Sequence, residues 1–580
     1  MKKTIILAGI LAVTGSVKAQ NAIDAYSISQ PDMKGTARFM GMAGAFGALG
    51  GDLTAISQNP AGIGVYRSSD IGFTLDLDLQ KARSTAGMLS NDMDQTKFLL
   101  NNMGAVLTLR MQSSTFPNFN FGFTYNKGAS FNRRYGGNIG NLHTSMSNYI
   151  AAIAESDGVT EGDVWETGGV DPYNPGFGYY QAPWITILGA QTGVILPQYN
   201  QATDKTKWYG MWQDSMNGND TSGTGTFAVE EKGGINEFNI VIGGNILDKL
   251  YWGMNFSITN VNYRMSTYWG ESLMNAYGID SNGKPFRENL NWNLNSGYTL
   301  SGTGFNYQLG LIFKPVQQFR LGFAFHTPTW YSLNEEFIGM MNYNGEYGNV
   351  SNTTNYGVPG YNSYNFRTPW KIIASAAGVI SDKLIVSFDY EWANYGNMHF
   401  SEPSTYYDDW YYDDWNYPMP YSASAGGPIH PDFIDPNDPY GYENYDIKSY
   451  YKSTNTFRVG LEFKPVSSLS IRAGYSYVSS PVKSAAKNND LIIYTAALTP
   501  SYRFDNTTNY ITFGLGYRYQ HVYVDLAYVL KKMDSEFHAY SPDPDNKYVI
   551  NAQGVKENLV PQAKLNFTNN QIVLSAGYRF

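Results

Sequence analysis

The sequence contains no cysteine among its 580 residues, and this absence excludes two structural classes. Without cysteine the chain has no disulfide framework and cannot be a lipoprotein anchored through a modified cysteine. Long apolar runs are missing as well. After residue 20 there is no apolar stretch of about 18 residues or more, so a membrane-spanning helix is not expected.

Charge is also scarce, because Asp, Glu, Lys and Arg together make up only 15% of the residues. Acidic residues outnumber basic ones, and the formal net charge is −9. Loss of Lys2, Lys3 and Lys18 with an N-terminal leader would change that charge to −12. An acidic chain of this kind argues against nucleic acid as a partner.

The histidines are few and scattered, and neither His-x-His nor His-Glu-x-x-His occurs. No axial-ligand motif for haem and no Ser/His/Asp set can be identified. We therefore expect no cofactor, no metal site and no enzymatic activity, with hemin uptake and a barrel enzyme as weaker alternatives. The six histidines are His143, His326, His399, His430, His521 and His538.

The first 19 residues have the features of a secretory signal peptide. Lys2 and Lys3 precede a short apolar run, 5–13, and Ala19 stands just before the expected cleavage point. The apolar run is too short for a spanning helix. We therefore assign 1–19 to a signal peptide that is removed during Sec-type export.

Aromatic residues are abundant, at 16% of the chain, with 47 Tyr and 12 Trp. Tyr and Trp gather at membrane–water interfaces because each has an apolar body and a polar tip. The negative mean hydropathy does not conflict with a membrane protein, since a barrel strand exposes only every second residue to lipid. Composition alone leaves a soluble, sugar-binding β-protein open as an alternative.

The C-terminal segment 571–580 alternates between an apolar face, which ends in Phe580, and a face of small or polar residues. A spanning sheet must close into a barrel because every backbone group in lipid needs a partner, and such barrels end in this way. The same alternation recurs along the chain, with Gly, Ser, Asn or charged residues on the second face. The apolar faces lie in 119–125, 250–258, 319–325, 384–392 and 522–530.

Counting these segments predicts an all-β fold, a transmembrane antiparallel β-barrel of about 14 strands. Tight turns are expected at the repeated Lys-Pro and Asp-Lys pairs, which each lie between two alternating strands. The predicted strand centres are residues 74, 107, 122, 241, 255, 308, 323, 375, 388, 459, 474, 514, 526 and 575. We assign 65–580 to the barrel, with long extracellular loops at 136–235, 269–300, 331–366, 401–452, 480–506 and 533–567.

Residues 20–64 do not alternate and are rich in glycine and alanine. A small-residue segment ahead of a wide barrel predicts a hatch, a plug folded inside the lumen, with a flexible periplasmic tail as the alternative. Gly41, Gly44 and Gly47 do not form a phosphate loop, because the spacing differs and no Lys-Ser/Thr pair follows.

The segment 37–46, Asp52 and the motif Asn59-Pro60-Ala61-Gly62 together resemble the N-terminal hatch of the FadL/TodX family. Proteins of that family are outer-membrane transporters of long-chain fatty acids and other hydrophobic compounds. The expected strand number and the C-terminal Phe580 fit the resemblance, whereas the long loops do not visibly match. The resemblance implies a bacterial outer-membrane location, a hydrophobic small-molecule ligand, and contacts with lipid and with the barrel-assembly machinery. We expect a monomer.

The same resemblance implies capture of the ligand by loops, binding in the lumen above the hatch, and lateral release through a gap in the wall. The third strand loses its alternation at Asn126-Lys127-Gly128, and a straight strand would aim Lys127 at lipid. We expect a bulge or kink at Lys127 and Gly128. The alternative is that the strand simply leaves the membrane there.

The loop 401–450 carries a tandem Tyr-Tyr-Asp-Asp-Trp repeat, 406–415, and further carboxylates at 432–438. A solvated surface loop is the preferred interpretation. The alternatives are calcium binding by the carboxylates and binding of sugars or an apolar ligand by the aromatic residues. Inward-facing charges are expected to form internal ion pairs or to contact a carboxylate headgroup. These residues are Arg320, Arg472, Arg579, Asp389, Glu391 and Asp525. A surface adhesion or structural barrel that binds glycans or partners through its loops is the main rival function.

Overall fold

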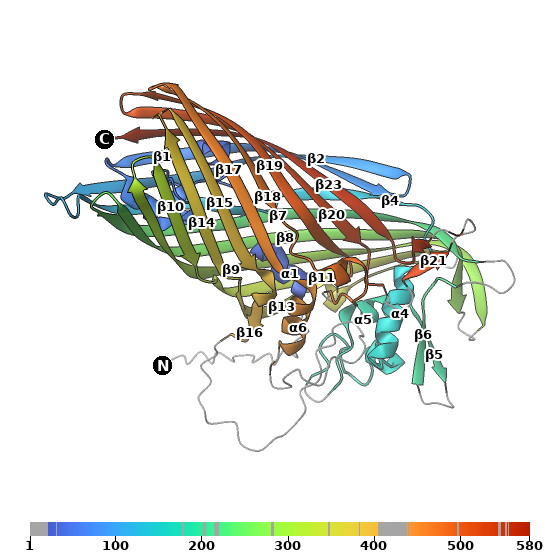
Figure 1. The fold of residues 1–580 in the computed structure, drawn as a ribbon. Coiled ribbons are helices and arrows are strands. Elements are labelled where there is room, and N and C mark those ends of the chain that lie inside the picture. Colours follow the sequence, from blue (N-terminus) through green and yellow to red (C-terminus); the bar gives the residue numbers. More distant parts are fainter. Residues whose placement is uncertain are drawn as a thin grey trace, which may run out of the picture.

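In the computed structural model the chain forms a long barrel that contains its own N-terminal segment (Figure 1). The structure describes residues 21–30, 32–176, 179–200, 205–213, 220–279, 284–345, 348–381, 383–403, 438, 440–495, 498–542, 547–550, 554 and 556–580. The predicted signal peptide and the tandem aromatic repeat lie outside these residues. Among the helices of the described ranges, none is long and apolar enough to cross a membrane.

The strands vary from three to 32 residues in length. They are β1 (Asp70–Ala86), β2 (Leu89–Arg110), β3 (Asn118–Ser130), β4 (Arg133–Ile139), β5 (Leu196–Asn200), β6 (Lys205–Tyr209), β7 (Ser222–Ile246), β8 (Leu250–Ile279), β9 (Pro285–Val316), β10 (Phe319–His326), β11 (Trp330–Gly345), β12 (Gly348–Thr353), β13 (Gly360–Arg367), β14 (Lys371–Ile380), β15 (Leu384–Asn394), β16 (His399–Ser401), β17 (Ser453–Val466), β18 (Leu469–Val478), β19 (Tyr502–Tyr519), β20 (Val522–His538), β21 (Tyr548–Ile550), β22 (Lys556–Asn558) and β23 (Gln562–Arg579).

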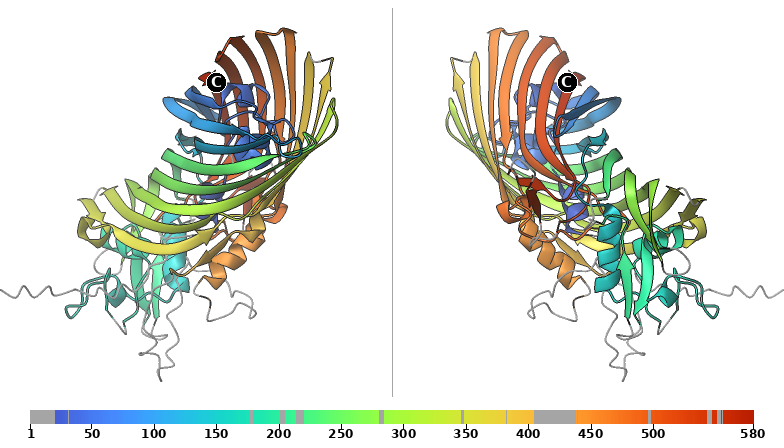
Figure 2. Two further views of the ribbon diagram at one scale, coloured as in Figure 1. Left: turned by 90° about the vertical axis from the view of Figure 1, so that its left-hand side faces the viewer. Right: turned by 90° about the vertical axis from the view of Figure 1, so that its right-hand side faces the viewer.

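The helices are short. They are α1 (Ala22–Ser29), α2 (Ala37–Gly41), α3 (Ala55–Gln58), α4 (Met146–Ser156), α5 (Trp184–Thr192), α6 (Gly441–Tyr450) and α7 (Ser484–Lys487), with 3₁₀ turns η1 (Pro60–Val65), η2 (Glu161–Asp163), η3 (Thr354–Gly357) and η4 (Tyr395–Asn397). Helices α4, α5 and α6 gather at one end of the barrel, opposite the C-terminus (Figures 1 and 2).

The barrel closes because β1 pairs antiparallel with β2 on one side and with β23 on the other. The ring runs β1, β2, β3, β7, β8, β9, β10, β14, β15, β17, β18, β19, β20, β23 and back to β1, which makes 14 strands. Each of the 14 predicted strand centres falls inside one of these strands, so the predicted number and order are confirmed.

A belt of exposed apolar side chains surrounds the half of the barrel that holds the C-terminus. On β9 it comprises the outward-facing residues from Phe305 to Phe313, while Asn306 and Gln308 between them are buried inside. This apolar belt recurs on neighbouring strands, for example at Phe323 on β10 and Leu526 on β20. Apolar side chains outside and polar ones inside are the reverse of a soluble fold and typical of a barrel in lipid.

Beyond the belt the alternation inverts. On β8 the outward residues Asn260 and Asn262 are exposed, whereas Val261 and Tyr263 point inward and are buried. The inward residues of this end join a large aromatic and aliphatic core that also includes α4 and α5. The outer part of the barrel is therefore packed like a water-soluble domain.

This inversion corrects the predicted loops. Residues 269–300 and 331–366 are mostly strand, because β8 runs to Ile279, β9 begins at Pro285, and β11, β12 and β13 form a paired sheet. The other four predicted loops also include strand ends. Backbone pairing continues above the apolar belt, where outward side chains no longer need to be apolar, so the apolar alternation stops before the strand does.

Candidate functional site

The N-terminal segment lies inside the barrel, and its helices begin at capping residues. Asn21 caps α1, since its side-chain oxygen accepts hydrogen bonds from the backbone N–H groups of Ile23 and Asp24. Thr36 caps α2 and donates its hydroxyl to Asp52 at 2.7 Å. Between the two caps Gly35 has a φ of +150°, and a Cβ there would clash with Thr54. Glycine is thus required at this bend.

The Asn-Pro-Ala-Gly motif is anchored to the barrel wall. Asn59 is 1% exposed and donates from its amide to the carbonyl of Gly47 at 2.6 Å and to that of Leu311 on β9. Its side-chain oxygen accepts the N–H of Ala61 at 3.1 Å and fixes the 3₁₀ turn that Pro60 begins. In the structure the motif attaches the hatch to β9 through Asn59. Its role in transport stays a prediction.

Glycines of the wall let the hatch approach backbone to backbone. A Cβ on Gly310 would overlap Asn59, and one on Gly322 would overlap the carbonyl of Gly47. Gly514 also faces the backbone of Gly41, and a Cβ on Gly514 would lie 3.3 Å from the Gly41 Cα. The small residues of the hatch therefore face small residues of the strands, and both are needed for the contact.

Ion pairs hold the same part of the hatch from the other side. Arg38 on α2 forms an ion pair with Glu462 at 3.1 Å. Arg472 forms ion pairs with Glu462 and, at 2.5 Å, with Asp525. Asp389 accepts the N–H groups of Phe46 and Gly47.

The charged residues that the sequence placed in the lumen do face inward. Arg579 pairs with Asp70, Glu391 pairs with Arg458, and Arg320 donates to the carbonyl of Leu49. Each of them has an internal partner. Residues 36–64 form what we call the anchored floor.

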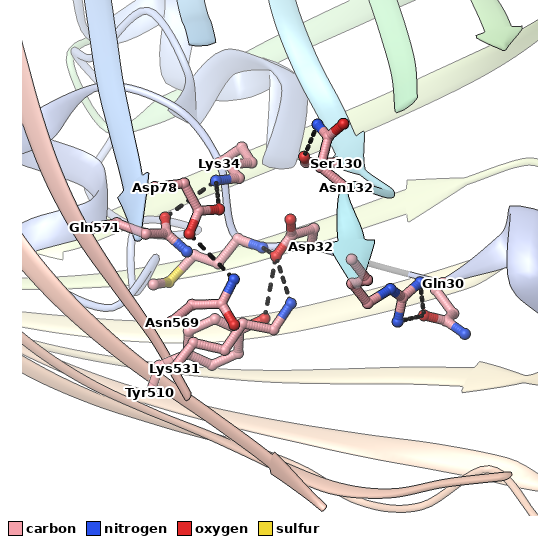
Figure 3. A network of polar contacts seen from close by, with 12 residues as sticks. Gln30, Asp32, Lys34, Asp78, Ser130, Asn132, Tyr510, Lys531, Asn569 and Gln571 are labelled. Atoms are coloured by element: carbon pink, nitrogen blue, oxygen red, sulfur yellow. Dashed lines mark hydrogen bonds and ion pairs between the residues drawn. The ribbon is translucent and has the colours of Figure 1, made fainter. Parts of the chain in front are cut away.

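Residues 21–30 and 32–34, here called the N-terminal arm, are held differently. Lys34 donates to Asp76 at 2.7 Å and lies 3.3 Å from Asp78, and Asp32 pairs with Lys531 at 3.0 Å (Figure 3). Burial by itself would raise the pKa of Asp32, but Lys531 and Lys34 outweigh it and lower that pKa to about 2. Two ammonium groups thus tie the C-terminal part of the arm to the wall, while α1 packs its apolar side chains into the core, with Tyr26 stacked on Tyr451.

The ring has a local break between β2 and β3. Their pairing ends at Asn102 and Asn126, whereas β3 continues along β7 with a register shift between Lys127 and Ala129. The irregularity lies at Lys127 and Gly128, where the sequence predicts a bulge or kink. Lys127 faces outward and donates to Asn236 at 3.0 Å.

Two residues, Phe131 and Asn132, separate β3 from β4 next to the break. β3 ends at Ser130 and β4 begins at Arg133, and β4 pairs with β7 rather than with β2. Arg133 turns inward and forms an ion pair with Glu231 at 2.9 Å, and Arg503 lies on the other side of that carboxylate at 3.7 Å. These inward charges are the functional candidates that sequence reasoning missed. The sequence pattern held little signal for them, because Glu231 and Arg503 lie in segments predicted as loops, 136–235 and 480–506, and the structure places them in β7 and β19.

Two small cavities follow the N-terminal arm. One of about 40 Å³ is lined by α1, by the hydroxyl-bearing residues Thr495, Thr499, Ser501 and Tyr502, and by Arg503. The other, of about 30 Å³, lies between Asp32, Gln80 and residues 129–133 of the break. Each of these two cavities holds no more than a few water molecules.

The histidines of the described chain do not gather into a site. His326 contacts the carbonyl of Gln58, His143 pairs with Glu557, and His538 stacks on Tyr502. Within the described residues no group of three or more His, Asp or Glu is placed to hold a metal ion. Most of the acidic loop 401–450 lies outside those residues.

Comparison with known proteins finds no matching family model and no matching curated protein. Solved structures that resemble the chain include a FadL homologue of Pseudomonas aeruginosa, with 12% identity, coverage of 95% of this chain and 99% of that one, and a TM-score of 0.48. The toluene transporter TodX of P. putida has 12% identity, coverage of 95% and 99%, and a TM-score of 0.46. The toluene transporter TbuX of Ralstonia pickettii has 12% identity, coverage of 95% and 99%, and a TM-score of 0.42. All three TM-scores are below 0.5, so the evidence for the closed ring is the strand pairing within this molecule.

Proposed function

We propose that this protein is a passive outer-membrane transporter of hydrophobic small molecules, with long-chain fatty acids as the first class to test. The observation that carries the proposal is the break between β2 and β3, which lies beside the N-terminal arm in an otherwise closed ring. Exposed apolar side chains border the break, Leu100 and Met103 on β2 and Phe123 on β3, so a molecule that leaves there meets an apolar surface. An apolar ligand gains roughly 0.8 kcal/mol per buried CH₂.

In the proposed cycle a ligand is captured at the outer end, enters the lumen beside the arm and leaves sideways through the break. The anchored floor stays in place, because its backbone contacts and ion pairs are too many to break together. The arm moves instead, and Gly35 is its hinge. The signal peptide is removed on export, Phe580 contacts the assembly machinery, and the barrel functions as a monomer.

A surface adhesion barrel is the second candidate. Exposed aromatic side chains at the outer end favour it, among them Trp165, Tyr356 and Tyr361. This function would depend on those side chains and would leave the lumen without a ligand.

The first experiment is extraction and mass spectrometry of small molecules that co-purify with protein solubilised from its native membrane. A stoichiometric hydrophobic compound, reduced in an Asn59→Ala/Pro60→Ala variant, supports transport. An empty barrel in several detergents favours adhesion.

The route is tested by bridging the break. Because the chain has no cysteine, Leu100→Cys with Gly128→Cys can be linked by a bismaleimide without background. Linking should reduce fatty-acid uptake by cells, whereas Ala105→Cys with Phe123→Cys joins residues that already pair and should leave uptake unchanged. Equal uptake before and after linking at the break excludes lateral release at this place.

A further inference from the structure

The tight turns lie at the end of the barrel that holds the C-terminus (Figure 1), and two pairs of lysines lie side by side in them. In the register of β8 and β9, Lys249 lies opposite Lys314, and the N–H of Lys314 donates to the carbonyl of Lys249 at 2.7 Å. Lys383 and Lys464 repeat this arrangement beside β15 and β17, again with a backbone hydrogen bond of 2.7 Å. The Asp-Lys and Lys-Pro turns of the sequence therefore meet in space as two lysine pairs.

The first lysine pair is electrostatically unfavourable in the protein alone. Like charges directly opposite each other on neighbouring strands destabilise a sheet. Asp248, the carboxylate next to Lys249 in the chain, pairs with Arg67 instead. Lys314 donates to the neutral side chain of Gln317 at 3.3 Å, and among the described residues neither lysine of the pair has an ion-pair partner.

The second lysine pair also carries surplus positive charge. Lys464 lies 3.3 Å from Glu462, but that carboxylate already pairs with Arg38 and Arg472. Glu462 thus meets three cations, and Lys383 adds a further positive charge beside them. The same costly arrangement occurs on two separate parts of the ring, and this repetition indicates an anionic partner.

The position of the lysine pairs selects that partner. Lys314 and Lys464 directly follow Phe313 and Phe463, which are outward side chains of the apolar belt and are 47% and 45% exposed. In a membrane this is the level at which the belt ends and the head groups begin. A lysine stem can lie on apolar surface while its ammonium group reaches the head groups. A phospholipid whose chains lie along the belt can therefore place its phosphate between two ammonium groups.

We propose that each lysine pair binds the phosphate of an anionic glycerophospholipid from the leaflet at the turn end, with the acyl chains against the apolar belt. Lysine binds phosphate as a point charge, and basic side chains at a membrane surface attract anionic lipids. A choline lipid brings its own cation next to the phosphate, which a pair of ammonium groups disfavours. The two sites require only that the barrel lies in a membrane, so their absence would leave the proposed transport untouched.

The test compares two lipids with the same acyl chains, phosphatidylglycerol and phosphatidylcholine. Purified full-length protein in detergent is incubated with an equal mixture and passed through a lipid-free column, and the retained lipids are quantified by mass spectrometry. We expect phosphatidylglycerol to be retained about tenfold or more over phosphatidylcholine, the effect of two basic side chains near an anionic lipid.

Variants connect this preference to the lysine pairs. Lys249→Gln with Lys314→Gln removes one site, and Lys383→Gln with Lys464→Gln removes the other. Each double variant should lose about half of the retained phosphatidylglycerol, and the quadruple variant should bring the ratio of the two lipids close to one. Lys249→Arg with Lys314→Arg keeps both charges and should keep the preference.

The control variant is Lys81→Gln with Lys232→Gln. These lysines of β1 and β7 are 49% and 45% exposed and lie outside the tight turns, so the control removes the same amount of charge without touching a pair. Folding of every variant is checked by the heat-dependent shift of the barrel on a denaturing gel. A large excess of glycerol 3-phosphate, which has the phosphate without the chains, should leave the lipid bound.

A lipid ratio close to one for the unaltered protein overturns the two sites, and so does retention of neither lipid. A preference that the quadruple variant keeps, or that the control variant loses as well, also overturns them. Displacement of phosphatidylglycerol by glycerol 3-phosphate would show that the lysines bind free phosphate, and would overturn the assignment to lipid.

Discussion

Replacing Lys34 by methionine should release the N-terminal arm without unfolding the barrel. The Lys34 side chain is 0% exposed, and so is that of Asp76, while Asp78 is 10% exposed. Burial alone would lower the pKa of Lys34, but Asp76, Asp32 and Asp78 raise it above its ordinary value, so the group is charged. Methionine keeps the length of the side chain and removes the charge.

The magnitude follows from the two carboxylates that remain. Removing one partner of a buried ion pair costs about 3–5 kcal/mol because the other charge is left uncompensated. Release of the arm lets water reach the carboxylates and relieves that cost. At about 1.4 kcal/mol per tenfold, the opening equilibrium should rise at least about 100-fold.

The assay exploits the absence of cysteine. Ser29 on the arm is 8% exposed, so Ser29→Cys provides a single buried thiol whose maleimide labelling rate reports opening. Lys34→Met in this background should raise that rate at least about 100-fold. Lys81→Met is the control, because Lys81 pairs with Asp92 on the surface at 49% side-chain exposure, where ion pairs contribute little.

A charge-neutral rescue separates electrostatics from shape. Adding Asp76→Asn and Asp78→Asn to Lys34→Met removes the uncompensated charge and should return labelling close to the parent rate. Unchanged labelling in Lys34→Met would refute the view that this cation holds the arm. Fast labelling in the triple variant would show that packing, and not charge, is responsible.

Three other predictions concern the hatch. The pKa of Asp32 is lowered to about 2, so its pair with Lys531 stabilises the folded arm above pH 4 and is lost only as the pH falls toward 2. The rate at which a methanethiosulfonate labels Ser29→Cys should therefore stay constant from pH 7 to pH 4. A rise in that rate near pH 5 would contradict this prediction. Asn59→Ala removes the hydrogen bonds to the carbonyls of Gly47 and Leu311. It should destabilise the folded barrel by about 1–3 kcal/mol, measured as a lower midpoint in urea by tryptophan fluorescence. Gly322→Ala should undock the anchored floor and increase ion conductance in planar bilayers. Gly378→Ala is the control and should not increase it, because the added Cβ would lie 3.9 Å from its nearest neighbour. Equal conductance of the two variants would contradict the packing argument.

The strand alternation identified the barrel because lipid imposes a strict rule on outward residues. Phe319 to Phe325 must be apolar at every second position, so the pattern is readable without any neighbour. Above the belt the rule no longer applies, so the sequence pattern predicts a loop at 269–279, where the structure continues β8. The small residues around Asn59 likewise predicted close packing, since glycine and alanine in such density serve little else.

The site was predictable only in part. The irregularity at Lys127 and Gly128 was visible because a charge broke an apolar face. The partners of Lys34 were not visible, since Asp76 and Gln571 are far from it in the chain and converge only when β1 pairs with β23.

The sequence by itself determined the closed barrel, its 14 strands and the small-residue hatch, because each follows from local periodicity and composition. The tertiary structure alone decided which part of the hatch is anchored by backbone contacts and which is held by two lysines and by the packing of α1. It also decided that a polar cavity lies behind the break in the wall. Such features depend on contacts between residues hundreds of positions apart, and closure of the ring, not local preference, brings those residues together.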